Sequence, residues 1–85
     1  MTYRVKDIGL AAALITAGQK LIEVLRESKI CWFLFENGDK CAELDRKYWF
    51  GELLVNARSY KQSLDQLKNI VHFEERKGVI VNDKQ

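Results

Sequence analysis

The fold is decided by residues 20–36, "KLIEVLRESKICWFLFE", in which strand-forming side chains dominate two runs on either side of a short polar break. The runs cover residues 20–27 and 30–36, and only Ser28 and Lys29 lie between them. Two β-rich runs with a two-residue connection are typical of an antiparallel hairpin. Because the connection has a fixed length, it also fixes which residues lie opposite each other and which side chains share a face.

The two faces of this hairpin differ in chemistry. One face is apolar along most of its length, with Lys20 and Arg26 towards its ends, and we expect it to lie in the core. Its apolar residues are Ile22, Val24, Cys31, Phe33 and Phe35. The other face alternates apolar side chains with carboxylates, which a core cannot hold unpaired. It carries Leu21, Glu23, Leu25, Glu27, Ile30, Trp32, Leu34 and Glu36. The alternation predicts a half-exposed face.

The apolar side chains on the half-exposed face have to be covered by another part of the chain or by a binding partner. An apolar centre with a charged rim is ordinary interface anatomy, so the sequence predicts a homodimer whose interface includes Leu25, Trp32 and Leu34. Two alternatives stay open. A helix or the C-terminal tail covers the face, or Trp32 stacks on a nucleic-acid base, although the carboxylates around it would repel phosphates.

The first strand and the first two helices follow from capping residues and periodicity. The run "TYRV" near the N-terminus is a short strand candidate. Asp7 as an N-cap and Gly18 as a left-handed C-terminal stop bracket a helix over residues 8–17. This helix is rich in alanine and glycine, so it is slim enough to lie close against a sheet. A second helix is expected over residues 39–50, after the turn "NGD".

The last helix carries one apolar stripe, and a charged tail follows it. Asn56 can cap this helix, whose stripe consists of Ala57, Tyr60, Leu64, Leu67 and Val71. Residues 1–73 are thus predicted to form the domain. The tail, residues 74–85, is charged around a short "VIV" run, which either adds an edge strand or frays.

The composition limits the class of function. Eighty-five residues form one domain, and 47% hydrophobic with 31% charged residues is typical of a globular protein. Fourteen basic and twelve acidic side chains give a net charge of +2, whereas strong DNA-binding domains are clearly basic. The longest apolar stretch, residues 8–18, is too short to span a bilayer, and we expect a cytoplasmic protein.

No catalytic or metal-binding motif is recognisable. Cys31 and Cys41 fit neither a paired metal motif nor a disulfide framework, and both fall on apolar positions, which predicts reduced core residues. The single histidine, His72, lies in a charged context. Phosphate-binding glycine motifs are absent. We therefore expect a non-enzymatic protein without a cofactor or a metal ion.

A second cluster of rings and cations follows the hairpin, in "DRKYWFGE" and the helix after it. Cations that track a backbone and flat rings that receive bases are what a single-stranded nucleic-acid site requires. The candidate contacts are Arg46, Lys47, Trp49, Phe50, Arg58 and Lys61. Acidic side chains nearby could instead pair with these cations along the helix surfaces. These are Glu43, Asp45, Glu52 and Asp65.

The runs "KDIGLAAALITAG", "CWFLFEN", "CAEL" and "YWFGE" together resemble a family of small bacterial and phage proteins known only as a domain of unknown function. The resemblance covers roughly residues 3–71 and implies a shared fold. The occurrence of that family in phages and mobile elements suggests a genome-handling or host-interaction role. A fainter likeness, in aromatic layout only, is to small single-stranded-DNA-binding proteins of thermophiles.

The sequence therefore predicts an α+β domain in the order β-α-β-β-α-α, with a small antiparallel sheet and helices packed chiefly on one of its faces. The predicted function is non-enzymatic binding of single-stranded nucleic acid by the ring-and-cation cluster. The alternative is a protein-interaction module of a phage or mobile element that binds a host protein.

Overall fold

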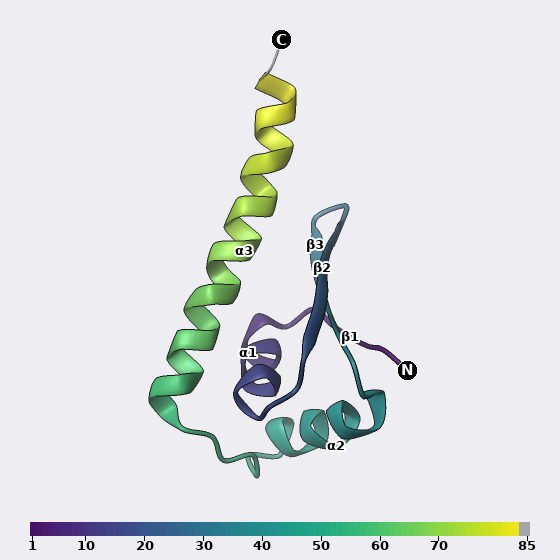
Figure 1. The fold of residues 1–85 in the computed structure, drawn as a ribbon, viewed down its shortest axis with the longest axis vertical. Coiled ribbons are helices and arrows are strands. Elements are labelled where there is room, and N and C mark those ends of the chain that lie inside the picture. Colours follow the sequence, from purple (N-terminus) through teal and green to yellow (C-terminus); the bar gives the residue numbers. More distant parts are fainter. Residues whose placement is uncertain (84–85) are drawn as a thin grey trace.

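The computed structural model describes the backbone of residues 1–83 and the side chains of residues 1–73. Over this range the chain forms an antiparallel sheet and three helices, in the predicted order (Figure 1). The elements are β1 (Tyr3–Val5), α1 (Ile8–Thr16), β2 (Leu21–Glu27), β3 (Ile30–Phe35), α2 (Gly38–Trp49) and α3 (Ala57–Asp83). The predicted α+β class and element order are confirmed.

The caps predicted from sequence form in the structure. Asp7 accepts a hydrogen bond from the backbone N–H of Leu10 at 2.9 Å and so begins α1. Asn56 accepts one from the backbone N–H of Ser59 at 2.9 Å and begins α3. Gly18 follows α1 with a φ of +99°, a left-handed backbone that favours glycine. Each cap spans only a few residues, so local sequence was enough to predict it.

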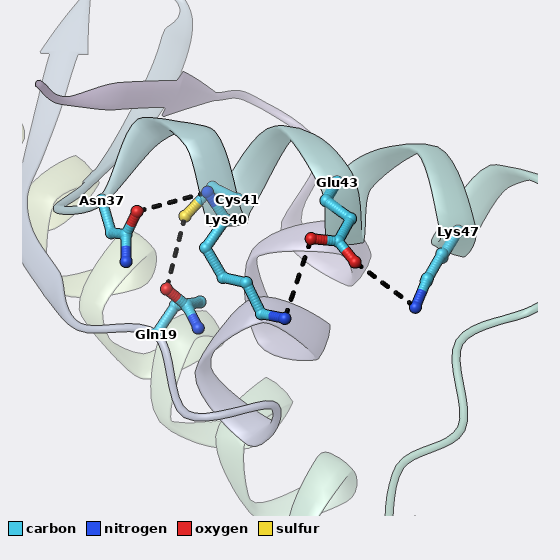
Figure 2. Close-up of polar contacts among 6 residues, drawn as sticks. All are labelled: Gln19, Asn37, Lys40, Cys41, Glu43 and Lys47. Carbon is cyan, nitrogen blue, oxygen red and sulfur yellow. Dashed lines mark hydrogen bonds and ion pairs between the residues drawn. The ribbon is translucent and has the colours of Figure 1, made fainter.

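The second helix begins at Gly38, one residue before its predicted start. Asn37 has a left-handed backbone, with a φ of 45°, and its side chain accepts a hydrogen bond from the backbone N–H of Lys40 at 3.2 Å (Figure 2). The N–H of Gly38 donates to the carbonyl of Met1 at 3.0 Å. The first residue of the chain is thereby attached to the start of α2.

The central strand of the sheet is β3, with β1 and β2 paired antiparallel on either side of it. The predicted hairpin register is confirmed from Glu23, which lies opposite Leu34, to the turn, where Arg26 lies opposite Cys31. Ser28 takes a φ of 60°, the left-handed conformation that a tight hairpin turn requires.

The predicted core position of Ile22 is wrong. A bulge between Leu21 and Glu23 inserts one residue into β2, so that Leu21 lies opposite Phe35. Beyond the bulge the alternation of faces is reversed. Leu21 therefore packs against the core in place of Ile22, whose side chain is 46% exposed. The prediction that Leu21 lies on the half-exposed face is wrong for the same reason.

The core lies between the sheet and α1. Phe33 and Phe35 are fully buried on the sheet side, and Leu14 is fully buried on the helix side. In Figure 1 the sheet is seen on edge, α1 lies between it and α3, and α2 lies across one end. All of residues 10–14 are buried. A helix buried on every side needs small side chains where its neighbours approach closely, which is the role of its alanines.

Of the two alternatives for the tail, an added edge strand or a frayed end, the edge strand does not form in residues 74–83. The backbone of α3 continues as a helix to Asp83 and extends beyond the tip of the β2–β3 hairpin (Figure 1). A helix that has already begun satisfies each further backbone group locally, whereas a strand at "VIV" would have to reach a sheet edge. The last two tail residues, 84–85, lie outside the described residues.

Candidate functional site: a groove between the two tryptophans

The aromatic side chains divide between the core and the surface. Phe33 and Phe35 are buried, whereas Trp49 is 61% exposed and Phe50 is 71% exposed. Trp49 is the last residue of α2 and Phe50 is its C-cap, so both rings lie where the helix ends and packing is sparse. Exposure of adjacent large rings is unusual on a small monomer and marks a candidate contact surface.

Trp32 and Trp49 line one open groove of about 390 Å³. The lining side chains come from β1 and the residues after it, from α1, from β3 and from α2. The lining residues are Arg4, Val5, Lys6, Asp7, Leu10, Trp32, Asp45 and Trp49. We call this feature the tryptophan groove. It joins two rings that are far apart in sequence over the apolar side chains of Val5 and Leu10.

Tyrosine contacts hold the walls of the tryptophan groove in place. The hydroxyl of Tyr3 donates a hydrogen bond to Asp45 at 2.5 Å, which links β1 to α2. The ring of Tyr48 meets that of Trp49 edge-on, with centroids 4.9 Å apart. The hydrogen bond from Tyr3 to Asp45, together with burial and the negative charge of that carboxylate, raises the pKa of Tyr3 to about 12. The neutral hydroxyl is therefore the form that the fold stabilises.

The Tyr3 contact predicts a loss of stability at alkaline pH. Because the folded-state pKa of Tyr3 lies above the usual value of 10, its stabilisation is fully present below about pH 10 and is lost as pH rises towards about 12. We expect the stability advantage of the wild type over Tyr3→Phe to shrink between about pH 10 and about pH 12, measured by urea unfolding. Tyr48 is common to both proteins, so its titration cancels. A constant advantage across this range would contradict the prediction.

The charges in and beside the tryptophan groove are balanced. The guanidinium of Arg4 lies 4.3 Å from the centroid of the Trp32 ring and forms an ion pair with Glu27 at 3.3 Å. The groove lining contains two cations and two carboxylates, the latter being Asp7 and Asp45. The groove therefore offers an apolar floor and a mixed, nearly neutral rim.

Two of the predicted nucleic-acid contacts are paired with acids on their own helices. Lys47 lies 3.5 Å from Glu43, which also contacts Lys40 at 3.8 Å (Figure 2). Lys61 lies 3.1 Å from Asp65. Exposed pairs of this kind add little to stability, but they reduce the positive potential that phosphates would meet. The structure thus places acids beside these two cations, as the alternative interpretation of the sequence expected.

The predicted cluster is only partly brought together. Arg46 lies on the last turn of α2 with Trp49, whereas Arg58 lies on the first turn of α3, beyond the connecting segment. Both arginines are exposed and form no ion pair within residues 1–73. Of the six predicted contacts, Trp49 alone lines the tryptophan groove.

Sequence reasoning missed Arg4 and Lys6 as members of the site. They alternate along β1 and its extension, so a strand pattern places them on one side. The pairing of Arg4 with Leu34 sets this side next to Trp32, and no local signal in the sequence reveals that pairing. The predicted interface residues Leu25, Trp32 and Leu34 are all half-buried on the same side of the sheet.

Comparison with known proteins assigns the chain to a family. The model of the family described as "Domain of unknown function (DUF5659)" matches residues 1–73. The chain belongs to this family. No curated protein and no solved structure matches the chain significantly. The resemblance to a domain of unknown function is thus confirmed, and the likeness to single-stranded-DNA-binding proteins is not shown.

The two cysteines are free thiols, and one of them is a core residue. Both are free of disulfides, and Cys41 is fully buried. Its thiol lies 3.5 Å from the carbonyl oxygen of Glu36. It also lies 4.0 Å from the side-chain oxygen of Gln19 (Figure 2). Burial raises the pKa of the Cys41 thiol, which disfavours the reactive thiolate. Cys31 is only partly buried.

The described residues contain neither a metal-ligand cluster nor a membrane-spanning helix. Among the residues that the structure describes, no three histidine, cysteine or acidic side chains gather as they would around a metal ion. No described helix combines the length and the hydropathy needed to cross a membrane.

Proposed function

We propose that the protein is a non-enzymatic module that binds another protein, with an apolar side chain of the partner held in the tryptophan groove. The observation that carries this proposal is that Trp32 and Trp49 flank one apolar, open groove with a balanced rim. Interfaces have apolar centres and polar rims, and tryptophan and arginine are enriched among the residues that dominate their binding energy.

The surface beside the groove supports a protein partner. After Trp49 the chain exposes Phe50 and then Leu54, whose side chain is 91% exposed. An aliphatic side chain offers no flat face to a base, but it adds apolar area to a protein contact. The family's occurrence in phages and mobile elements, which the sequence resemblance implied, suggests a host protein as the partner. A cytoplasmic location, in which both cysteines stay reduced, belongs to the same proposal.

Peptide selection tests the proposed function. We expect a random peptide library displayed on phage to yield peptides with an apolar or aromatic anchor when it is selected on the wild type. A synthetic copy of an enriched peptide should bind with micromolar affinity. Trp49→Ala should weaken binding at least about tenfold, or about 1.4 kcal/mol, because it removes one wall of the groove. Isothermal titration calorimetry measures both.

Phe50→Ala is the matched control for this experiment. Phe50 is adjacent to Trp49 and is 71% exposed, against 61% for Trp49, but it does not line the groove. Because Phe50 lies beside the groove and not in it, its replacement should weaken peptide binding clearly less than Trp49→Ala does. Equal effects of Phe50→Ala and Trp49→Ala, or a failure to enrich any peptide that prefers the wild type over Trp49→Ala, would reject the proposal.

Single-stranded nucleic acid is the second candidate ligand. It is favoured by the exposure of Trp49 and Phe50 near Arg46, which has no ion pair within residues 1–73. If oligonucleotides bind there, they quench tryptophan fluorescence with a log–log salt slope of about −1.5 to −3, from two to four phosphate contacts. Lys47→Ala would then lower that slope by about 0.7. With a protein ligand we expect no quenching by oligonucleotides at micromolar protein and low salt.

A further inference from the structure

One face of the sheet carries no secondary structure over it within residues 1–83. Figure 1 shows α1 and α3 on the same side of the sheet, with the opposite side open. The open side carries Arg4, Glu23, Leu25, Glu27, Ile30, Trp32 and Leu34. We call it the outer sheet face. Residues 74–83 of the tail do not cover this face, because they continue α3 on the other side of the sheet.

The charges on the outer sheet face are separated by strand. Arg4 lies on β1, and Lys6 follows it at the next alternate position. Glu23 and Glu27 lie on β2, on the other side of β3. The central strand contributes only apolar side chains to this face. The face is therefore basic along one edge, apolar along the middle and acidic along the opposite edge.

This pattern is complementary to itself. If the face is rotated by a half-turn about an axis along β3, β1 of one copy lies over β2 of the other. The basic edge of each copy then meets the acidic edge of its partner. A half-turn about an axis across the strands would instead place like charges together. Packed sheets commonly keep their strand directions within about 30° of each other, which the first arrangement satisfies.

We propose that the outer sheet face binds a second copy of this chain, in a homodimer whose two-fold axis runs along β3. Leu25, Trp32 and Leu34 form the apolar centre of the interface, and Arg4 faces the carboxylates of the partner. The dimer interface and the proposed peptide site share Arg4 and Trp32. Leu34 belongs to the interface alone and Trp49 to the groove alone, so variants of these two residues test the two proposals separately.

The contacts within one chain leave room for this partner. Arg4 stacks on Trp32 and reaches Glu27 on the neighbouring strand, yet its side chain is 49% exposed and that of Glu27 is 60% exposed. Both groups therefore keep hydrogen-bonding capacity for the partner. Packed sheets lie about 10 Å apart, enough for one layer of side chains such as the stacked guanidinium.

The size of the face limits the expected affinity. The strands have three, seven and six residues. At about 3.3 Å per residue and about 4.8 Å between strands, the face is at most roughly 15 by 20 Å. A footprint of roughly 300 Å² per copy lies below the size of standard specific interfaces, which is typical of a weak, transient dimer. We expect a dissociation constant in the micromolar range, which rises with salt because the charged edges are exposed.

Sedimentation velocity tests the interface. The wild type should sediment with twice the monomer mass at high micromolar concentration, and Leu34→Glu should halve this mass, since it places a charge at the apolar centre. Leu54→Glu is the matched control, because Leu54 is exposed on the loop after α2, away from the sheet, and it should leave the dimer intact. Circular dichroism confirms that each variant is folded.

A charge-swapped variant tests the axis even where Leu34→Glu fails to fold. It combines Arg4→Glu, Lys6→Glu, Glu23→Lys and Glu27→Arg, which reverses both edges of the face. For an axis along β3, this variant forms its own homodimer but no mixed dimer with the wild type, as native mass spectrometry can show. Mixed dimers, or a wild-type monomer at high micromolar concentration, would overturn the proposal.

Discussion

Phe35→Ala is expected to destabilise the protein by about 3–5 kcal/mol, the usual cost of deleting a buried phenylalanine ring. Phe35 is fully buried between the sheet and α1, so its removal loses apolar burial and leaves a cavity. A domain of this length has a total stability of roughly 4–13 kcal/mol. The loss is a large part of that total, so the variant should unfold at a much lower urea concentration than the wild type, as measured by urea titration followed by circular dichroism.

Phe50→Ala is the matched control for Phe35→Ala. Phe50 has the same side chain but is 71% exposed, and surface substitutions usually change stability by less than about 0.5 kcal/mol. The two variants together answer which phenylalanine rings the core needs. Comparable losses from both would mean that Phe50 is buried in solution, and that the exposed rings beside the tryptophan groove are not available to a partner.

Gly9→Ala is expected to lower the free energy of unfolding by about 1–3 kcal/mol, although helix propensity alone would predict an increase. Alanine favours a helix over glycine by up to about 1 kcal/mol, and Gly9 lies in the first turn of α1. However, an added Cβ would lie 2.8 Å from the hydroxyl oxygen of Tyr48 and 3.3 Å from that of Tyr60. Overpacking of this kind forces side chains or backbone to shift. Urea unfolding gives the sign directly.

The clash at Gly9 can be relieved from the other side. Tyr48→Phe removes the hydroxyl that the new Cβ would meet, so Gly9→Ala should cost less in the Tyr48→Phe background than in the wild type. A double-mutant cycle measures this coupling. Tyr60 is retained throughout, because its hydroxyl donates a hydrogen bond to the carbonyl of Gly9 at 3.2 Å. A stabilising Gly9→Ala, or strict additivity in the cycle, would show that α1 and α2 are not packed as described.

Most of the fold could be predicted because it depends on short-range rules. The hairpin register near the turn follows from the two residues between its strands. The caps at Asp7 and Asn56 act on backbone groups three residues away. The ion pairs of Lys47 and Lys61 join residues four apart on a helix. In each case the interacting groups are neighbours in sequence, so the pattern of residues contains the information.

The errors arose where local preference competed with longer-range structure. The bulge near the start of β2 moved Ile22 out of the core because one extra residue reverses the alternation of faces. The "VIV" run has high strand propensity, yet residues 74–83 continue a helix that is already formed. Propensity at a few positions could not show either outcome.

The sequence by itself determined the α+β class, the element order, the division of the hairpin into an apolar face and a mixed face, and the family. Only the tertiary structure decided which functional side chains meet. Arg4 and Trp49 are 45 positions apart and line one groove because β1 pairs with β3 while Tyr3 binds Asp45 on α2. Such contacts depend on the packing of whole elements, and loop closure over tens of residues has almost the same entropy for many alternative partners. The sequence pattern therefore supplied the rings and the charges, and the packing of β1 against β3 and α2 set them beside one another.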